Sequence, residues 1–256
     1  MLTRTRAIVL RSLESGEADL IVTCLTEDLG LVKGFAKSPR KTGSRFGSSL
    51  EPFSFIRISL FGKEGSSLLR ITGSDIIEPF QEIREDLRKV SALAPVINLT
   101  ERLLPEREPE KRSFTLLLLT LKYVRDSRPE YSTILSLFYV VRFLEIHGYS
   151  PRLDCCTGCN RDTATYHISQ GSLYCSECAS QHSDDGSVPL KISQGTKRLY
   201  HALLRWNLKS ILRIKVSPAI LRELAQLLQE HIRYHVIQRE SPLLMYPLQG
   251  PASQVV

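Results

Sequence analysis

Short runs of β-branched, aliphatic and aromatic residues recur along the first 80 positions, at residues 7–10, 20–25, 31–36, 53–61 and 67–72. Turn-forming clusters such as Glu14-Ser15-Gly16 separate these runs, and one longer loop covers residues 39–49. Five strands with a single long loop fit a small closed barrel better than an open sheet. The five-stranded oligonucleotide-binding (OB) barrel is the best-known fold of that size, so the sequence predicts an OB-type barrel over residues 1–80.

Apolar residues recur every three to four positions after Pro79, which predicts that the rest of the chain is mainly helical. A helix over residues 82–104 contains Pro95, where we expect a kink or a break. Two other helix starts have a candidate cap, Ser113 and Ser217. The predicted helices after residue 104 cover residues 113–124, 133–147, 193–206, 208–214 and 217–239.

The fold class predicted from these patterns is α+β. An N-terminal barrel is followed by a helical domain, and a cysteine-rich module is embedded in that domain. The predicted boundaries are 1–80 for the barrel, 81–150 and 190–247 for the two parts of the helical domain, and 151–182 for the cysteine-rich module.

Four cysteines in that module, Cys156, Cys159, Cys175 and Cys178, form two pairs with two residues inside each pair. This spacing is typical of a structural zinc site, because two such turns bring four thiolates to one point. Cys155 is an alternative to Cys156 as the first ligand. The alternative to a zinc site is a set of reduced thiols that bind no metal. Four sulfur ligands leave no open position for a water molecule, so the predicted Zn²⁺ is structural and not catalytic.

Charge is unevenly distributed along a chain whose formal net charge is +7. Residues 191–256 hold ten Lys and Arg against three Asp and Glu, whereas residues 151–190 hold two against five. A basic surface is expected to attract a polyanion. The cations of the C-terminal segment either make the surface of the helices soluble or bind an acidic peptide. Apart from Lys191, they are Lys197, Arg198, Arg205, Lys209, Arg213, Lys215, Arg222, Arg233 and Arg239.

A second basic segment lies in the predicted barrel, between residues 33 and 45, and contains no acidic residue. Its cations and its glycine- and serine-rich loop are suited to phosphate groups, although such a run is also compatible with an ordinary solvated face. The candidate phosphate contacts are Lys33, Lys37, Arg40, Lys41 and Arg45, with Arg4, Arg6 and Arg57 as further candidates.

Alternation along residues 53–57 places Phe53, Phe55 and Arg57 on one face of a strand and Ile56 on the other. With the aliphatic face in the core, the two rings form a candidate base-stacking platform. A shift of phase near Pro52 would instead bury both rings.

The chain resembles the RecO family of bacterial DNA repair proteins over nearly its whole length. The resemblance is carried by residues 7–10, 16–22, 25–30 and 33–45, and most specifically by the segment from Phe143 to Leu153, which leads into the cysteines. Asn160 departs from the glycine usual in the family, and Pro39, Thr42 and Gly43 alter the basic loop. In the family's register Cys156, and not Cys155, is the first metal ligand.

The resemblance implies an OB barrel, a helical domain, a four-cysteine zinc module and a recombination mediator in the bacterial cytoplasm, associated with the nucleoid. Such a protein binds single- and double-stranded DNA and anneals complementary strands. Together with RecR it helps RecA to replace single-strand-binding protein (SSB), whose acidic tail docks on the helical domain.

The sequence holds none of the catalytic motifs that we considered, neither G-x-x-x-x-G-K-[ST] nor H-E-x-x-H, and we expect a protein that is not an enzyme. The alternative function is an adaptor that acts through protein contacts. A membrane partner is not expected, because the longest aliphatic run, residues 114–121, is too short to cross a bilayer.

Overall fold

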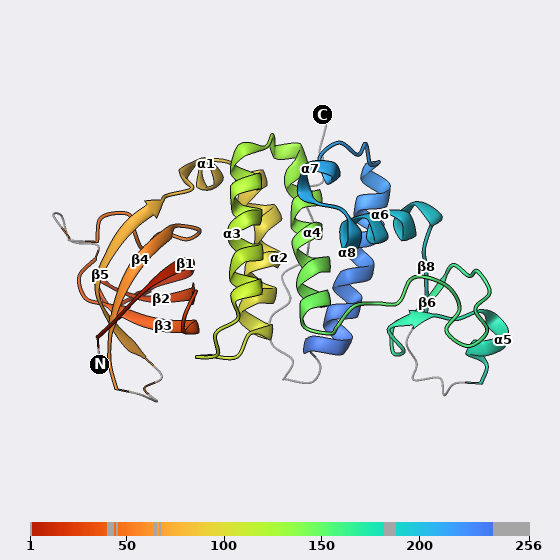
Figure 1. Ribbon diagram of the computed structural model, residues 1–256, viewed down its shortest axis with the longest axis horizontal. Coiled ribbons are helices and arrows are strands. Elements are labelled where there is room, and N and C mark those ends of the chain that lie inside the picture. Colours follow the sequence, from red (N-terminus) through yellow and green to blue (C-terminus); the bar gives the residue numbers. More distant parts are fainter. Residues whose placement is uncertain are drawn as a thin grey trace. The chain divides into compact units, whose positions relative to one another are not determined.

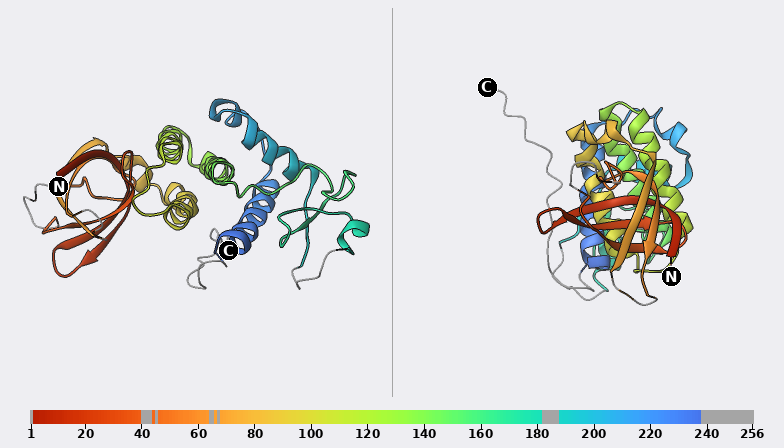
Figure 2. Two further views of the ribbon diagram at one scale, coloured as in Figure 1. Left: turned by 60° about the horizontal axis from the view of Figure 1, so that its bottom comes forward. Right: turned by 90° about the vertical axis from the view of Figure 1, so that its left-hand side faces the viewer.

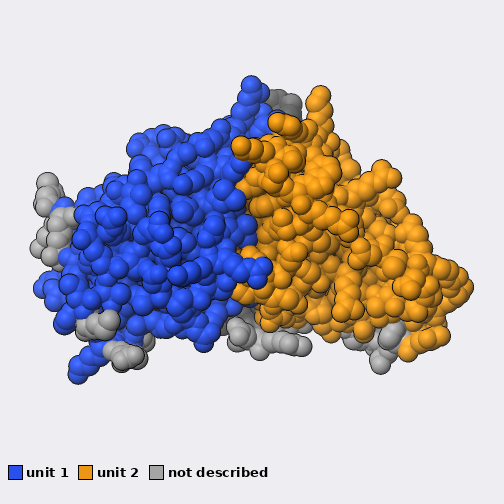
Figure 3. Space-filling model, in the orientation of Figure 1, with its two compact units in different colours: residues 1–132 blue, residues 133–256 orange. Residues whose placement is uncertain are grey.

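The computed structural model describes residues 2–39, 44, 46–63, 66, 68–181 and 188–237 (Figure 1). The chain divides into two compact units, residues 1–132 and residues 133–256 (Figure 3). The first unit contains the predicted barrel together with the helices that directly follow it. The second contains the cysteine-rich module and the remaining helices.

Five strands form a closed barrel in the order β1-β2-β3-β5-β4, which is completed by pairing of β4 with β1 (Figure 2). All neighbours are antiparallel except β3 and β5, which run parallel. This confirms the predicted OB-type barrel. The strands are β1 (Leu2–Ser15), β2 (Asp19–Thr26), β3 (Gly30–Ala36), β4 (Phe55–Phe61) and β5 (Leu69–Glu78).

Alternate residues of each strand fill the barrel, as the period of two requires. Ile56 and Ile58 of β4 lie in this core beside Ile71 of β5, and Cys24 of β2 is buried there as a small apolar residue. Gly34 of β3 also faces inward, because a Cβ at this position would lie 2.6 Å from a side-chain carbon of Ile71. Glycine is therefore needed where β3 and β5 approach each other.

The first unit continues with α1 (Gln81–Arg84), α2 (Leu87–Leu103), α3 (Lys111–Asp126) and the 3₁₀ turn η1 (Pro129–Tyr131). Of the kink or break predicted at Pro95, the break is wrong, since Pro95 lies inside α2 and the helical region is instead interrupted at residues 85–86, between α1 and α2. Asp86 caps α2 by accepting a hydrogen bond from the backbone N–H of Arg88. The predicted cap of α3 is also wrong, because Glu110 accepts from the N–H of Ser113 and the helix begins before that serine.

One end of the barrel's outer surface is buried in the first unit. Phe55, Ile8, Leu25 and Leu31 are register partners on β4, β1, β2 and β3, and all are buried. The ring of Phe55 meets that of Phe114 on α3 edge to face, with centroids 6.2 Å apart. The predicted stacking platform is therefore wrong: Phe55 is 5% and Phe53 is 7% exposed, and neither ring is open to a base.

The second unit begins with α4 (Ser132–Ile146) and ends with α8 (Pro218–Ile232), which continues into the π-helical turn η2 (Arg233–Ile237). Ser217 caps α8 and Pro218 is its first residue, as predicted. The predicted positions 238 and 239 lie outside the described residues. The other elements are β6 (Thr165–His167), β7 (Ser172–Leu173), α5 (Ser176–Ala179), β8 (Leu190–Lys191), α6 (Gln194–Arg205) and α7 (Leu208–Ile211).

No helix within the described part of the chain combines the length and the apolar character needed to traverse a bilayer.

Candidate metal centre and nucleic-acid-binding surface

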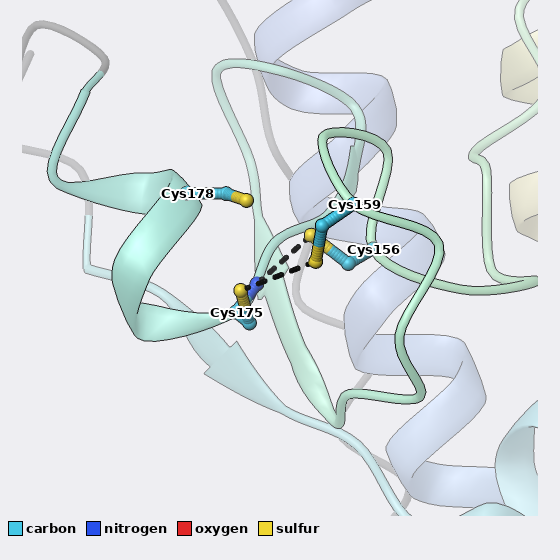
Figure 4. A group of neighbouring side chains, drawn as sticks. All are labelled: Cys156, Cys159, Cys175 and Cys178. Carbon is cyan, nitrogen blue, oxygen red and sulfur yellow. Dashed lines mark hydrogen bonds between the residues drawn. The ribbon is translucent and has the colours of Figure 1, made fainter.

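Four cysteine sulfurs converge in the second unit (Figure 4). Cys156 and Cys159 come from the turn before β6, Cys175 is the N-cap of α5, and Cys178 lies in α5. The four Sγ atoms lie within 4.8 Å of one another, and those of Cys159 and Cys175 are 3.7 Å apart. A tetrahedral metal with metal–sulfur bonds of about 2.3 Å requires sulfur separations of about 3.8 Å. The donor set and its spacing therefore fit a tetrahedral thiolate-bound metal.

The structure distinguishes between the two adjacent candidates for the first ligand. Cys156 is buried and belongs to the cluster, whereas the sulfur of Cys155 lies 3.7 Å from the side-chain oxygen of Asn160 and outside the cluster. Cys156 is thus the first of the four potential ligands.

Two residues, Gly158 and Asn160, permit the backbone conformation of the turn that holds Cys156 and Cys159. Asn160 has a φ of 59°, in the left-handed region that asparagine tolerates better than most residues with a side chain. Its N–H donates to the carbonyl of Cys156 at 2.8 Å. A Cβ at Gly158 would lie 2.9 Å from the sulfur of Cys178, so only glycine lets the two cysteine segments approach this closely.

Hydrogen bonds prepare two of the sulfurs for the thiolate form. The backbone N–H of Cys175 donates to the sulfur of Cys156 at 3.3 Å and lowers the pKa of that thiol to about 6. The Nε–H of Arg161 donates to the sulfur of Cys159 at 3.3 Å and lowers its pKa as well. The sulfurs of Cys175 and Cys159, in contrast, raise the pKa of Cys178 to about 12. A bound cation would replace that last proton.

Buried polar contacts join the cysteine-rich module to the helices of the second unit. The hydroxyl of Tyr200 on α6 donates to the carbonyl of Pro151 at 2.9 Å. His231 on α8 lies 2.6 Å from the carbonyl of Tyr149 through Nε2 and 2.6 Å from the hydroxyl of Tyr166 on β6 through Nδ1. Nε2 therefore carries the proton, and burial lowers the pKa of His231 to about 4.

The candidate DNA contacts on the barrel fall into three groups. Lys33, Arg4 and Arg6 form ion pairs with Glu106, Asp75 and Glu27, respectively. Lys37 and Arg57 are exposed and form no ion pair or hydrogen bond with another described residue. Arg40, Lys41 and Arg45 lie outside the described residues.

The barrel register brings some of these cations together. Arg6 of β1 lies opposite Arg57 of β4, which in turn lies opposite Asp75 of β5. Lys33 of β3 and Lys37, which directly follows β3, are both exposed and lie two positions from Phe35 in either direction. The exposed barrel surface thus holds cations on several neighbouring strands, some of them already paired with carboxylates.

Sequence reasoning missed one cation of this surface, Arg70 on β5. Arg70 is exposed, and it has no ion-pair or hydrogen-bond partner among the residues that the structure places. Its neighbours Leu69 and Ile71 are in the barrel core. This alternation of one outward cation between two inward aliphatic residues was a signal available in the sequence.

The basic C-terminal segment is only partly available to a partner. Lys197 is buried and contacts Asp162 at 2.7 Å, Arg233 pairs with Glu230, and Arg239 lies outside the described residues. An open hollow of about 350 Å³ is lined by Arg205, Trp206, Asn207 and Ser210. The exposed cations among the described residues of this segment are Lys191, Arg198, Arg205, Lys209, Arg213, Lys215 and Arg222.

Comparison with known proteins places both parts of the chain in one family. Residues 1–80 match the family model described as Recombination protein O N terminal, and residues 84–241 match Recombination protein O C terminal. The DNA repair protein RecO of Thermodesulfovibrio yellowstonii is 42% identical over 89% of this chain and 91% of its own length. Those of Dehalococcoides mccartyi and Alkaliphilus metalliredigens are each 30% identical, over 95% and 92% of this chain and 94% of their own lengths. The chain therefore belongs to the RecO family of DNA repair proteins.

Proposed function

We propose that this protein is a non-catalytic DNA repair factor that binds single- and double-stranded DNA and anneals complementary strands. The family supports the repair role. The observation that carries the DNA-binding part is the set of exposed cations without a partner among the described residues: Lys37 directly after β3, Arg57 on β4 and Arg70 on β5.

Annealing requires two polyanions to approach each other, and cations between them reduce the repulsion. Phosphate groups can bind to Lys37, Arg57 and Arg70 without breaking an ion pair or hydrogen bond between these cations and another described residue. Arg4 pairs with Asp75 at the surface, where both side chains are more than half exposed. Such a pair contributes about 0–1 kcal/mol, so a phosphate exchanges readily with the carboxylate. No covalent step is required.

We propose that the four-cysteine site holds Zn²⁺ with a structural role. When bound, the metal supplies Lewis acidity, which here serves to hold four thiolates in place. Cys156 and Cys159 anchor the turn before β6, and Cys175 and Cys178 anchor the start of α5. All four positions of a tetrahedral ion are then occupied by sulfur, which leaves none for a substrate.

Salt dependence of binding tests the DNA-binding proposal. Each lost phosphate contact lowers the slope of log K against log salt by about 0.7 for a single strand. The triple variant Lys37→Ala, Arg57→Ala and Arg70→Ala should therefore lower the slope by about 2 and should slow annealing of complementary oligonucleotides. Arg128→Ala, which removes an exposed cation of the first unit outside the barrel, is the matched control. An unchanged slope in the triple variant would contradict the assignment.

A second candidate role, protein contact, is favoured by the hollow beside Trp206. We propose that it accepts the acidic tail of SSB, because Trp206 is 49% exposed and Arg205 and Lys209 flank it. Cooperation with RecR in loading RecA onto SSB-coated DNA is part of the same proposal. An SSB tail peptide should quench the single tryptophan, and Lys209→Glu should weaken this binding but leave binding of a bare oligonucleotide unchanged. Quenching by the peptide that is unaffected in Lys209→Glu would argue against this site.

A further inference from the structure

A continuous row of outward-facing side chains crosses all five strands on the part of the barrel's outer surface that the helices leave exposed. Each member is the register partner of the next on the neighbouring strand. Because the strands of a closed barrel are tilted, the row begins and ends on β1. It consists of Leu2, Phe61, Arg70, Phe35, Ile21 and Leu13, called here the apolar row.

The members of the apolar row are open to solvent to an unusual degree for apolar residues. Leu2 is 64% exposed, and Phe61 and Leu13 are each 53% exposed. Phe35 and Ile21 are half-buried, and Arg70 is exposed. Exposed apolar side chains that form a contiguous set indicate a binding surface more strongly than scattered ones do.

The composition of the row and its surroundings indicates the chemistry of the ligand. Two aromatic rings, Phe35 and Phe61, lie on either side of Arg70 in the register. Lys33 and Lys37 flank Phe35 in the sequence, two residues away in each direction, Lys33 within β3 and Lys37 directly after it. Rings offer stacking surfaces to bases, and flanking cations meet the phosphates of the same strand. Only unpaired bases expose the faces that such rings require.

We propose that the apolar row binds unpaired nucleotide bases, with Phe61 and Phe35 as stacking residues and Arg70 between them as a phosphate or stacking contact. This inference rests on the proposed DNA-binding function and deepens it, because it assigns the recognition of unpaired bases to particular side chains of the same barrel surface. The cations bind any phosphate backbone, whereas the rings give the surface a preference for strands whose bases are free.

The proposal is tested by removing the aromatic ring from the protein and the bases from the DNA, each alone and both together. Wild type and Phe61→Ala are titrated with a thymidine oligonucleotide, with the same strand carrying abasic positions, and with a duplex of equal length. Loss of stacking costs about 1–3 kcal/mol per base, so Phe61→Ala should weaken thymidine binding by roughly tenfold. Binding of the abasic strand and of the duplex should be unchanged, and so should the salt slope, because no charge is removed.

Phe61→Leu serves as a second variant that keeps an apolar side chain and removes only the ring, in case the alanine variant is unstable. Phe61→Tyr should retain binding, and Leu87→Ala, which truncates an exposed apolar residue on α2, should bind as wild type does. Equal discrimination between thymidine and abasic strands by wild type and both ring-deletion variants would overturn the proposal while the DNA-binding function stands. So would the finding that the row binds a protein partner and not DNA. Failure of the wild type to bind any oligonucleotide would overturn the proposed function itself.

Discussion

Acidification should destabilise the second unit through His231, and the size of the effect follows from its surroundings. His231 is buried and neutral, with Nε2–H donating to the carbonyl of Tyr149 and Nδ1 accepting from the hydroxyl of Tyr166. Burial is the main cause of its low pKa, and the neighbouring His235 acts in the same direction. The hydrogen bond to Tyr149 opposes both.

The folded pKa of His231, about 4, lies below the ordinary value of 6.5. The unfolded chain therefore binds a proton before the folded chain does, and stability is fully present above pH 6.5 and is lost as the pH falls toward 4. The difference corresponds to about 3 kcal/mol when complete, of which about 2 kcal/mol should be lost by about pH 5.

Urea unfolding followed by the fluorescence of Trp206 measures this loss, because the chain has one tryptophan and it lies in the second unit. His231→Gln keeps an amide donor and an acceptor oxygen but does not titrate. The wild type should lose about 2 kcal/mol more than this variant between about pH 7.5 and pH 5. Protonation of carboxylates and of the clustered cysteine thiols affects both proteins and cancels in the comparison. Parallel pH profiles for the two proteins would refute the reasoning.

Two further pairs of variants test the metal centre and the barrel. Cys175→Ser should release the metal and destabilise the second unit by on the order of 5 kcal/mol or more, whereas Cys155→Ser should change stability by less than about 0.5 kcal/mol. Metal content and urea unfolding are measured for both variants. A Cys175→Ser protein that keeps its metal and has wild-type stability would exclude the site. Gly30→Ala should destabilise the first unit by at least about 2 kcal/mol, because a Cβ there would lie 2.1 Å from the carbonyl oxygen of Glu108 in addition to the strain of its φ of 69°. Gly16→Ala has the same φ but open space around it, so it should cost only about 1 kcal/mol, and equal melting temperatures for the two alanine variants would show that the contact with Glu108 is unimportant.

Features that depend on neighbouring residues in the chain could be predicted from the sequence. The alternation of β4 places Ile56 and Ile58 inside the barrel, and the serine–proline pair at 217 and 218 starts α8. The spacing of the cysteines likewise predicts the cluster, because each pair forms its own turn.

Features that depend on distant contacts could not be predicted in the same way. Phe55 is outward-facing in its strand, as expected, but Phe114 of α3 covers it, and no periodicity within β4 reports that. Arg4 and Lys33 have their carboxylate partners at positions 75 and 106. These ion pairs join segments that are distant in the sequence, so they form only when the fold brings those segments together. The choice between Cys155 and Cys156 depends on the direction of each side chain, which the spacing of the pairs left open.

The carboxylates beside Arg4, Arg6 and Lys33 have a consequence for selectivity. Asp75, Glu27 and Glu106 act as tethered counter-ions, held at an effective concentration that isolated anions in the cell cannot match. Such a surface pair contributes only about 0–1 kcal/mol, so a single phosphate group gains little by displacing one carboxylate, whereas a polyanion would displace several at once and release its own condensed cations as it does so. Under the proposed DNA-binding function, this part of the barrel surface therefore favours long nucleic acid strands over small metabolites that carry phosphate.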